Sequence, residues 1–485
     1  MSARHCVKRN PRRTDILTTP VSQTDRQVRF LLIFAGLSFL PALAFYYVGE
    51  EAIFPITSLE MWHAREWFRQ PLFGLNVQHN PLFNWLIIPF AAMAGWEYML
   101  PVARALTIAV TLATCAVVAW LAKNVVRDAQ FARVAALVYL TLADVLLYRG
   151  WLAYVDPLFG FFVFSAIAAL WVACEQDRPR LLAVAVASLT CAFLAKAFTA
   201  YVFYGVAVLV LFAHARYRRV LLHPLSLALH LAAIAAPVAW FALLPKNEGQ
   251  GGRMLGEILA KLVPQSLVEY CGQLAGFPLE TAGRLMPAIG VAAWLLWVKR
   301  AVINENYAPP LRIAAWIAGI NFLPYWLSPH GNIRYLLPMY PVIALAFALV
   351  FWSAWQRSAA LILRWLAAAV IVKYVAAVAI FPYYQSHYRG ENYARAARDI
   401  IARSANHALY TTDDSASGLS VAGYIDAWRY PQSPPLRWAP AAWDSGFVLS
   451  YTLKPELGRL VQHYRLGGND LYLLCRGDAC PGAAR

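Results

Sequence analysis

Apolar segments alternate with short polar loops along most of the chain, from about residue 30 to about residue 381. Eleven of these segments are predicted to cross a membrane as helices, because a spanning helix needs a nearly continuous run of apolar residues. The pattern therefore predicts a polytopic α-helical membrane protein. The predicted spans lie at about 30–48, 101–122, 131–148, 152–174, 181–197, 199–213, 220–244, 285–298, 312–328, 335–355 and 360–381.

Composition supports the same class and excludes a soluble protein. Of the 485 residues, 60% are hydrophobic and only 14% are charged, and the mean hydropathy is +0.49. A soluble fold of this length has no means of burying so much apolar surface. The formal net charge is +16, but the basic residues cluster in short loops between spans. There they indicate membrane topology and not a nucleic-acid partner.

A basic tail, residues 1–29, precedes the first predicted span. That span is too long for the core of a signal peptide and lacks a small-residue cleavage site, so we expect it to be retained. Loops rich in Lys and Arg stay in the cytoplasm, which places this tail on the cytoplasmic side. Its basic residues are Arg4, Lys8, Arg9, Arg12, Arg13, Arg26 and Arg29.

A twelfth apolar segment, from Pro81 to Gly95, is only about half as long as a comfortable span and also contains Pro89. If it does not cross, every basic loop between later spans falls on the cytoplasmic side; if it crosses, they all fall outside. We therefore expect an interfacial or re-entrant helix within a periplasmic first loop, residues 49–100. The deciding basic residues are Lys123, Arg127, Arg133, Arg178, Arg180, Arg216, Arg218, Arg219, Lys299, Arg300, Arg357 and Arg364.

This topology brings polar groups from distant parts of the sequence to one membrane face. Ionisable groups near the bilayer are costly and usually serve a function, so their convergence predicts a site for an anionic, lipid-borne substrate. The alternative for the first loop is that its acids simply face water. The converging residues are Glu50, Glu51, His79, Asp156, Lys196, His330, Arg334 and Tyr335.

The apolar pattern ends near Phe381, and residues 382–485 have the mixed composition and size of a separate domain. A helix over 392–404 and strands over 408–412, 446–452 and 470–475 predict a soluble α/β fold. This domain follows the transmembrane region, residues 30–381, and would lie in the periplasm. An oxidising compartment would permit a disulfide between Cys475 and Cys480, with Cys271 as a third candidate.

Common catalytic motifs are absent from the sequence. It contains no CxxC pair, HExxH, GxGxxG, phosphate-binding GxxxxGK[ST] or GxSxG motif. Chemistry driven by a nucleotide is therefore disfavoured.

Several short stretches, taken in order, resemble the GT-C superfamily of membrane glycosyltransferases, in particular the aminoarabinose transferase and protein mannosyltransferase type. The resemblance covers the membrane region. It implies transfer of a sugar from a polyprenyl-phosphate carrier to a lipid, glycan or protein at the periplasmic face of a bacterial inner membrane. The stretches are Glu50-Glu51-Ala52, Asn80-Pro81-Leu82-Phe83-Asn84-Trp85, Asp156-Pro157-Leu158, Phe193-Leu194-Ala195-Lys196 and Arg334-Tyr335-Leu336-Leu337-Pro338.

Two stretches depart from the family pattern. Glu50-Glu51-Ala52-Ile53 stands where the family usually has Asp-Glu-Ala-Arg, and Gln78-His79-Asn80-Pro81 stands where aminoarabinose-type relatives have Glu-Lys-Pro-Pro. The lost Arg, Glu and Lys change the residues available for donor phosphate or metal. His79 is either a substitute phosphate partner, a metal ligand or a turn-capping residue.

The residue types fit an inverting sugar transfer, which needs a carboxylate base and cations on the phosphate leaving group. Glu50 or Glu51 would be the base. Asp156 would position the substrate or a cation, its alternative role being a helix N-terminal acid favoured by the dipole. If a divalent metal takes part, Glu50, Glu51 and His79 are its candidate ligands. The expected phosphate-binding residues are His79, Lys196, His330, Arg334 and Tyr335.

Two other classes of protein share these features. A transporter or lipid flippase also has many spans and buried charges, although this chain shows no two-fold repeat of broken helices. A structural subunit for envelope lipids is the second. Loss of transfer after mutation of the carboxylates separates an enzyme from both.

Overall fold

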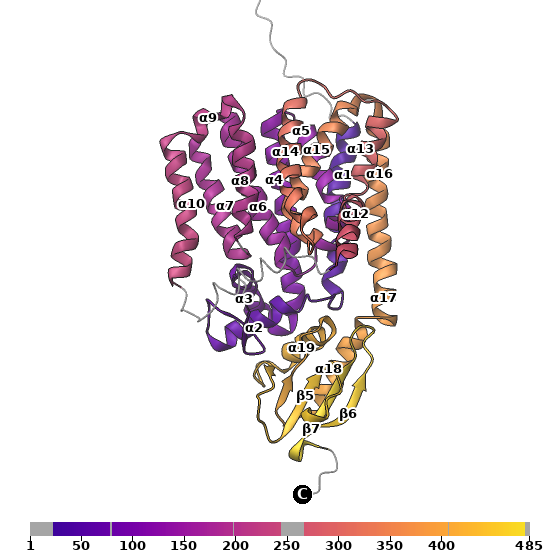
Figure 1. Cartoon of the computed structure of the whole chain (residues 1–485). Helices are drawn as coiled ribbons and strands as arrows, with labels where there is room; N and C mark the ends of the chain where they lie inside the picture. Colours follow the sequence, from indigo (N-terminus) through magenta and orange to yellow (C-terminus); the bar gives the residue numbers. More distant parts are fainter. Residues whose placement is uncertain (1–22, 78–79, 197, 244–265, 406, 481–485) are drawn as a thin grey trace, which may run out of the picture.

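The computed structural model describes residues 23–77, 80–196, 198–243, 266–405 and 407–480. Its helices form a bundle with a smaller α/β domain at one end (Figure 1), as the sequence predicts. The bundle helices are α1 (Gln23–Leu37), α4 (Met99–Val126), α5 (Ala129–Leu140), α6 (Val155–Gln176), α7 (Leu182–Ala195), α8 (Thr199–Phe212), α9 (Ala215–Leu221), α10 (Pro224–Leu243), α12 (Leu267–Arg284), α13 (Ala288–Trp297), α14 (Ala308–Leu327), α15 (Tyr340–Ser353), α16 (Trp355–Val375) and α17 (Phe381–His387). Short 3₁₀ or π-helical turns join or extend several of them: η1 (Leu40–Ala44), η3 (Asp144–Arg149), η5 (Ile333–Met339) and η6 (Ala376–Ile380).

Each predicted span contains a helix of the described structure. Six helical segments, of 19 to 33 residues, are long and apolar enough to cross a membrane. Four further spans hold the shorter apolar helices α5, α7, α8 and α13, and the remaining one holds the 20-residue α14. The structure adds α12, whose apolar residues occupy one face instead of forming a continuous run. Hydrophobic length therefore located the bundle helices but not this amphipathic one.

The first loop folds into a small unit at the same end of the bundle as the C-terminal domain (Figure 1). Its α3 lies beside α2, where the sequence predicts a helix that does not cross. Asn84 holds the unit together, because its amide donates to Thr57 (2.7 Å) and Ser58 (2.9 Å) and accepts from Gln70 (2.6 Å). The elements are α2 (Ile53–Ala64), β1 (Gln70–Leu72), β2 (Leu75–Val77) and α3 (Leu82–Ala94).

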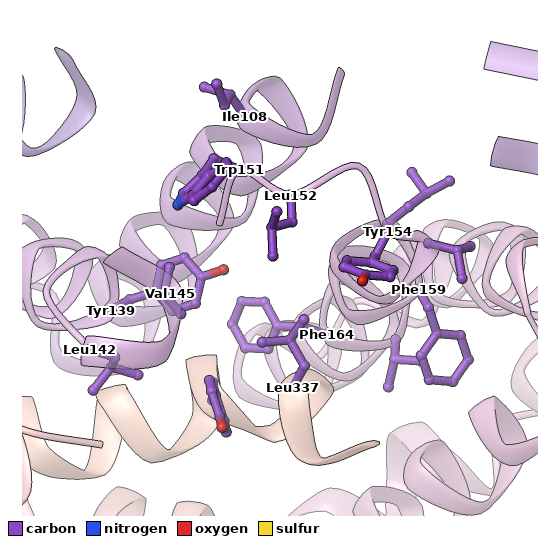
Figure 2. Close-up of a cluster of buried hydrophobic side chains, with 14 of the residues drawn as sticks. Ile108, Tyr139, Leu142, Val145, Trp151, Leu152, Tyr154, Phe159, Phe164 and Leu337 are labelled. Atoms are coloured by element: carbon purple, nitrogen blue, oxygen red, sulfur yellow. The ribbon is translucent and has the colours of Figure 1, made fainter. Parts of the chain in front are cut away.

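Bulky side chains fill the bundle where α4, α5 and α6 meet η5. Figure 2 shows Ile108, Tyr139 and Phe164 gathered with residues of the segment 145–154. Trp151 and Leu152 in that segment are completely buried. Lipid is as apolar as this core, so close packing holds such helices together more than exclusion of water does. This packing fixes the start of α6, where the predicted site residue Asp156 lies.

The C-terminal domain is a five-stranded mixed sheet with strand order β4-β3-β5-β7-β6. β3 is parallel to both β4 and β5, and β7 is antiparallel to both β5 and β6. A disulfide joins Cys475 to Cys480 at the end of β7, whereas Cys271 is free and exposed. The elements are α18 (Glu391–Arg403), β3 (Leu409–Thr411), α19 (Ala416–Arg429), β4 (Arg437–Trp438), β5 (Gly446–Ser450), β6 (Arg459–Tyr464) and β7 (Leu471–Arg476).

The C-terminal domain packs on the first loop, and a backbone hydrogen bond joins the two. The Trp438 N–H donates to the Phe73 carbonyl (2.8 Å). Beside this bond, Glu60 of α2 accepts the N–H groups of Phe73 (2.6 Å) and Gly74 (2.9 Å). Burial raises the pKa of Glu60 to about 7, although these N–H groups and nearby Arg437 oppose the shift.

We expect the stability of this interface to fall as pH rises. The pKa of Glu60 is higher in the folded chain than its ordinary 4.5, so folding favours the protonated form. Stability is then greatest below about pH 4.5, decreases up to about pH 7 and stays constant above it, with a total loss on the order of 3 kcal/mol. Burial also raises the pKa of Asp426 on α19, against the charge of Arg429, and this acts in the same direction.

Thermal unfolding of the purified protein at pH 5 and pH 8 measures this effect. Glu60→Gln should reduce the difference in Tm between the two pH values, whereas Glu456→Gln, at an exposed acid, should leave it unchanged. Equal differences in wild type and Glu60→Gln would show that Glu60 does not titrate in this range.

Candidate functional site

A sharp turn between η1 and α2 presents the two adjacent glutamates in different directions. Gly49 has a φ of +60°, and a Cβ there would lie 2.9 Å from the Tyr154 hydroxyl oxygen. That hydroxyl accepts the Glu50 backbone N–H (3.0 Å). Glycine is therefore required for both the backbone conformation and the close approach. The Glu50 side chain remains exposed, whereas Glu51 is completely buried.

Glu51 forms a two-pronged ion pair with Arg104 of α4. The Arg104 Nε lies 2.7 Å from Glu51 Oε1, and its Nη2 lies 2.6 Å from Oε2. The backbone N–H groups of Ala153 (2.8 Å) and Val48 (3.1 Å) donate to the same two oxygens. Both oxygens are thus occupied by donors, and neither ion-paired side chain is exposed.

Arg104 also organises the chain that precedes the glutamates. Its guanidinium donates to the carbonyls of Ala42, Phe45 and Tyr46 over 2.5–2.8 Å. Five donor groups arranged in a planar fork suit this task. We therefore propose a structural role for Glu51 in place of the catalytic one expected from the sequence, with the pair fixing the turn that presents Glu50.

Asp156 and Lys196 form an ion pair at the same end of the bundle. Asp156 lies in the first turn of α6 and is 4% exposed, and Lys196 follows the last residue of α7. The Lys196 ammonium also lies 4.7 Å from the centre of the Tyr335 ring. A carboxylate at a helix N-terminus is stabilised by the helix dipole, and here it also holds a cation in place.

Arg334 and Tyr335 come from η5 and complete this cluster. Arg334 Nη2 lies 3.3 Å from the Tyr335 hydroxyl, and its backbone N–H donates to the Asn332 side chain (3.0 Å). Glu50 and Asp156 both interact electrostatically with the Arg334 guanidinium. The Arg334 Nε is buried and has no hydrogen-bond partner among the described residues. The cluster thus offers an N–H group for a ligand.

The structure brings together most of the predicted site residues. Glu50, Asp156, Lys196, Arg334 and Tyr335 converge, whereas His330 lies exposed on the turn before η5.

His79 lies outside the described residues. Its neighbour Asn80 donates to the Phe193 carbonyl (2.6 Å), which places this part of the first loop beside the end of α7.

Comparisons with known proteins identify the fold. A crystal structure of ArnT from Cupriavidus metallidurans bound to undecaprenyl phosphate matches with a TM-score of 0.69 and 13% identity, over 95% of this chain and 98% of that one. The apo state of ArnT matches with a TM-score of 0.66, over 93% and 98% of the two chains. This chain has the ArnT fold. No protein-family profile matches the sequence, and no curated protein sequence does.

The ArnT fold confirms what the resemblance to GT-C glycosyltransferases implied about architecture. At 13% identity the likeness establishes fold and not activity. The site must therefore be judged on this chain's own residues.

Two arginines near the cluster did not enter the sequence prediction. Arg104 falls within a predicted span. An ionisable residue within a span usually has a partner or a function, so the sequence did contain a signal for Arg104. Arg149 ends η3, is 8% exposed, and places its guanidinium 5.6 Å from the centre of the Tyr154 ring. Tyr154 in turn binds the Glu50 backbone, so Arg149 adds positive charge close to the site.

The candidate metal ligands are only partly described in this ArnT fold, because His79 lies outside the described residues. Within the described part of the chain, no group of three or more His, Cys, Asp or Glu side chains is close enough to hold an ion. Glu51 is occupied by Arg104 and two backbone donors. Of the three expected ligands, only Glu50 is described and exposed. We therefore assign no step to a metal.

Proposed function

We propose that this protein is a membrane glycosyltransferase that moves a sugar from a polyprenyl-phosphate carrier to a lipid, glycan or protein acceptor. The observation that carries the proposal is the Asp156–Lys196–Arg334 cluster beside exposed Glu50, at one end of an ArnT fold. The ArnT structure with the same fold is bound to undecaprenyl phosphate. Cations at a bilayer surface can bind a phosphate leaving group, and a nearby acid can accept a proton from the acceptor.

Lys196 and Arg334 are assigned to the donor phosphate. Both cations lie against the Tyr335 ring, at 4.7 Å and 5.2 Å from its centre, so one phosphate can contact both. The free Nε–H of Arg334 provides a directional donor, and guanidinium groups pair well with phosphate oxygens. The ion pair with Asp156 holds the Lys196 side chain in this position.

Glu50 is assigned to the acceptor. As the acceptor oxygen attacks the anomeric carbon, its proton passes to the Glu50 carboxylate, and the bond to the phosphate breaks with the electron pair staying on phosphate oxygen. Attack from the side opposite the leaving group inverts the configuration at the anomeric carbon. If the acceptor is itself a phosphate, no proton moves, and Glu50 only orients the acceptor.

The site is assigned to the periplasmic face of a bacterial inner membrane. Support comes from the basic loops at the opposite ends of the spans and from the Cys475–Cys480 disulfide in the C-terminal domain. The tail 1–29 would be cytoplasmic, and the domain that follows the bundle would be periplasmic. Protease added to intact spheroplasts should cleave that domain, and full protection would contradict this orientation.

Loss of donor affinity tests the assignment of the two cations. Lys196→Gln and Arg334→Gln should each weaken binding of a polyprenyl-phosphate sugar about tenfold to a hundredfold, because a charge-assisted hydrogen bond contributes roughly 1.5–3 kcal/mol. Binding to the purified protein in detergent is the measurement. Lys299→Gln, which removes an exposed charge from a loop at the other end of the bundle, is the control. Unchanged affinity in both variants would remove these residues from the site and the proposal would lose its main support.

A further inference from the structure

A basic cavity lies away from the proposed active site, where α17 meets the C-terminal domain. It encloses about 480 Å³ between the end of α17, the first turns of α18 and the loop between β6 and β7. Arg389, Arg395 and Arg465 line it, and each comes from a different one of these segments or the links between them. His387, Tyr384 and Tyr388 contribute the remaining aromatic lining.

The cavity has a defined construction. Gly467 has a φ of +73°, and a Cβ at this position would lie 2.5 Å from the Tyr388 carbonyl oxygen, so glycine lets the β6–β7 loop approach α17. Arg389 spans the gap, donating from Nε to the Gly467 carbonyl. Asn392 adds a second connection, since its amide donates to the carbonyls of Tyr388 (3.2 Å) and Arg465 (3.4 Å).

Its charge is largely uncompensated. Among the described residues, Arg395 forms an ion pair with Glu391 at 3.7 Å, and both side chains are well exposed. Three arginines against one glutamate leave a net charge of +2. Guanidinium groups that converge without carboxylate partners favour an anion, and their planar donors match phosphate oxygens.

The position along the chain places this cavity at headgroup level. The apolar segment Trp355–His387 has 33 residues, which corresponds to roughly 50 Å of helix, against about 30 Å of hydrocarbon. Arg357 and Arg364 mark the opposite end of this segment. α17 therefore extends into the interface, where exposed Tyr383, Tyr384 and Tyr388 form the aromatic belt typical of that depth.

We propose that this cavity binds the phosphate headgroup of an anionic bilayer lipid, in the leaflet on which the C-terminal domain rests. The arginines would hold the phosphate, while the acyl chains lie along the apolar surface of α16 and η6. The proposal is independent of the glycosyl-transfer chemistry, since no residue of that site lines the cavity.

Native mass spectrometry tests the proposal. The full chain is released from detergent in the presence of a small excess of phosphatidylglycerol or phosphatidylcholine. Wild type should retain phosphatidylglycerol preferentially. Arg465→Gln should lower its affinity about fivefold and Arg395→Gln/Arg465→Gln roughly 25-fold, given about 1 kcal/mol for each basic residue at a membrane surface. Lys454→Gln, at an exposed charge outside the cavity, should bind like wild type.

The remaining arms distinguish the ligand source and protect against misfolding. Arg465→Lys should restore most of the binding, and a matching Tm confirms that each variant is folded; if the double variant is not, Arg465→Gln alone gives the comparison. Inorganic phosphate should not displace the lipid. Displacement by phosphate would identify a site for soluble anions and overturn the lipid assignment, as would equal phosphatidylglycerol binding by wild type and the glutamine variants.

Discussion

Glu51→Gln is expected to lower the free energy of unfolding by about 3–5 kcal/mol, the usual cost of removing one partner from a buried ion pair. The Arg104 guanidinium would then remain charged and completely buried without its carboxylate. It would still bind three carbonyls, but these are neutral and cannot replace the lost charge. Denaturant or thermal unfolding of the purified protein measures the loss.

Two control variants test whether the lost ion pair causes the loss of stability in Glu51→Gln. Glu97→Gln makes the same change at an exposed acid in the first loop and should leave stability within about 0.5 kcal/mol of wild type. In Glu51→Gln/Arg104→Gln both charges are gone, so the double variant should be less destabilised than the sum of the single ones. Wild-type stability in Glu51→Gln would contradict a structural role.

The sequence was sufficient for what depends on hydrophobic length. The predicted spans all contain helices, and α3 lies beside α2 at the end of the bundle where the C-terminal domain packs. The helices follow from a local property of the chain, because a continuous apolar run forms a helix. That α3 does not cross the membrane stays a prediction.

What the sequence could not supply depends on contacts between distant residues. Neighbouring side chains diverge, which predicts that one glutamate of the pair turns inward, but the choice of Glu51 is made by Arg104, 53 positions later. Helix α19 is a second case. Its glycines disfavour a helix, yet Gly423 lies against the Tyr47 ring, where a Cβ would be only 3.0 Å from ring atoms. Tertiary packing here overrides local preference.

The second large effect is expected for Glu50, which is exposed whereas Glu51 is buried. Glu50 is exposed beside Arg334 and Asp156, and its backbone is held by Tyr154, so its carboxylate is presented by the fold without being needed for it. Glu50→Gln should therefore leave the Tm unchanged. If Glu50 accepts the acceptor's proton, the rate of transfer should fall about a hundredfold to ten-thousandfold, the range for loss of a general base.

Purified variants assayed with a polyprenyl-phosphate sugar and a hydroxyl acceptor decide the matter. Glutamine keeps the size and hydrogen bonding of the side chain but cannot take the proton, whereas Glu50→Asp keeps a carboxylate on a side chain one methylene shorter and should recover part of the rate. A drop in rate with unchanged donor affinity separates Glu50 from Lys196 and Arg334, whose loss should appear first in binding. Full activity in a folded Glu50→Gln protein would reject Glu50 as the base and make Asp156 the next candidate, since it is the other carboxylate beside Lys196 and Arg334, the proposed phosphate-binding cations.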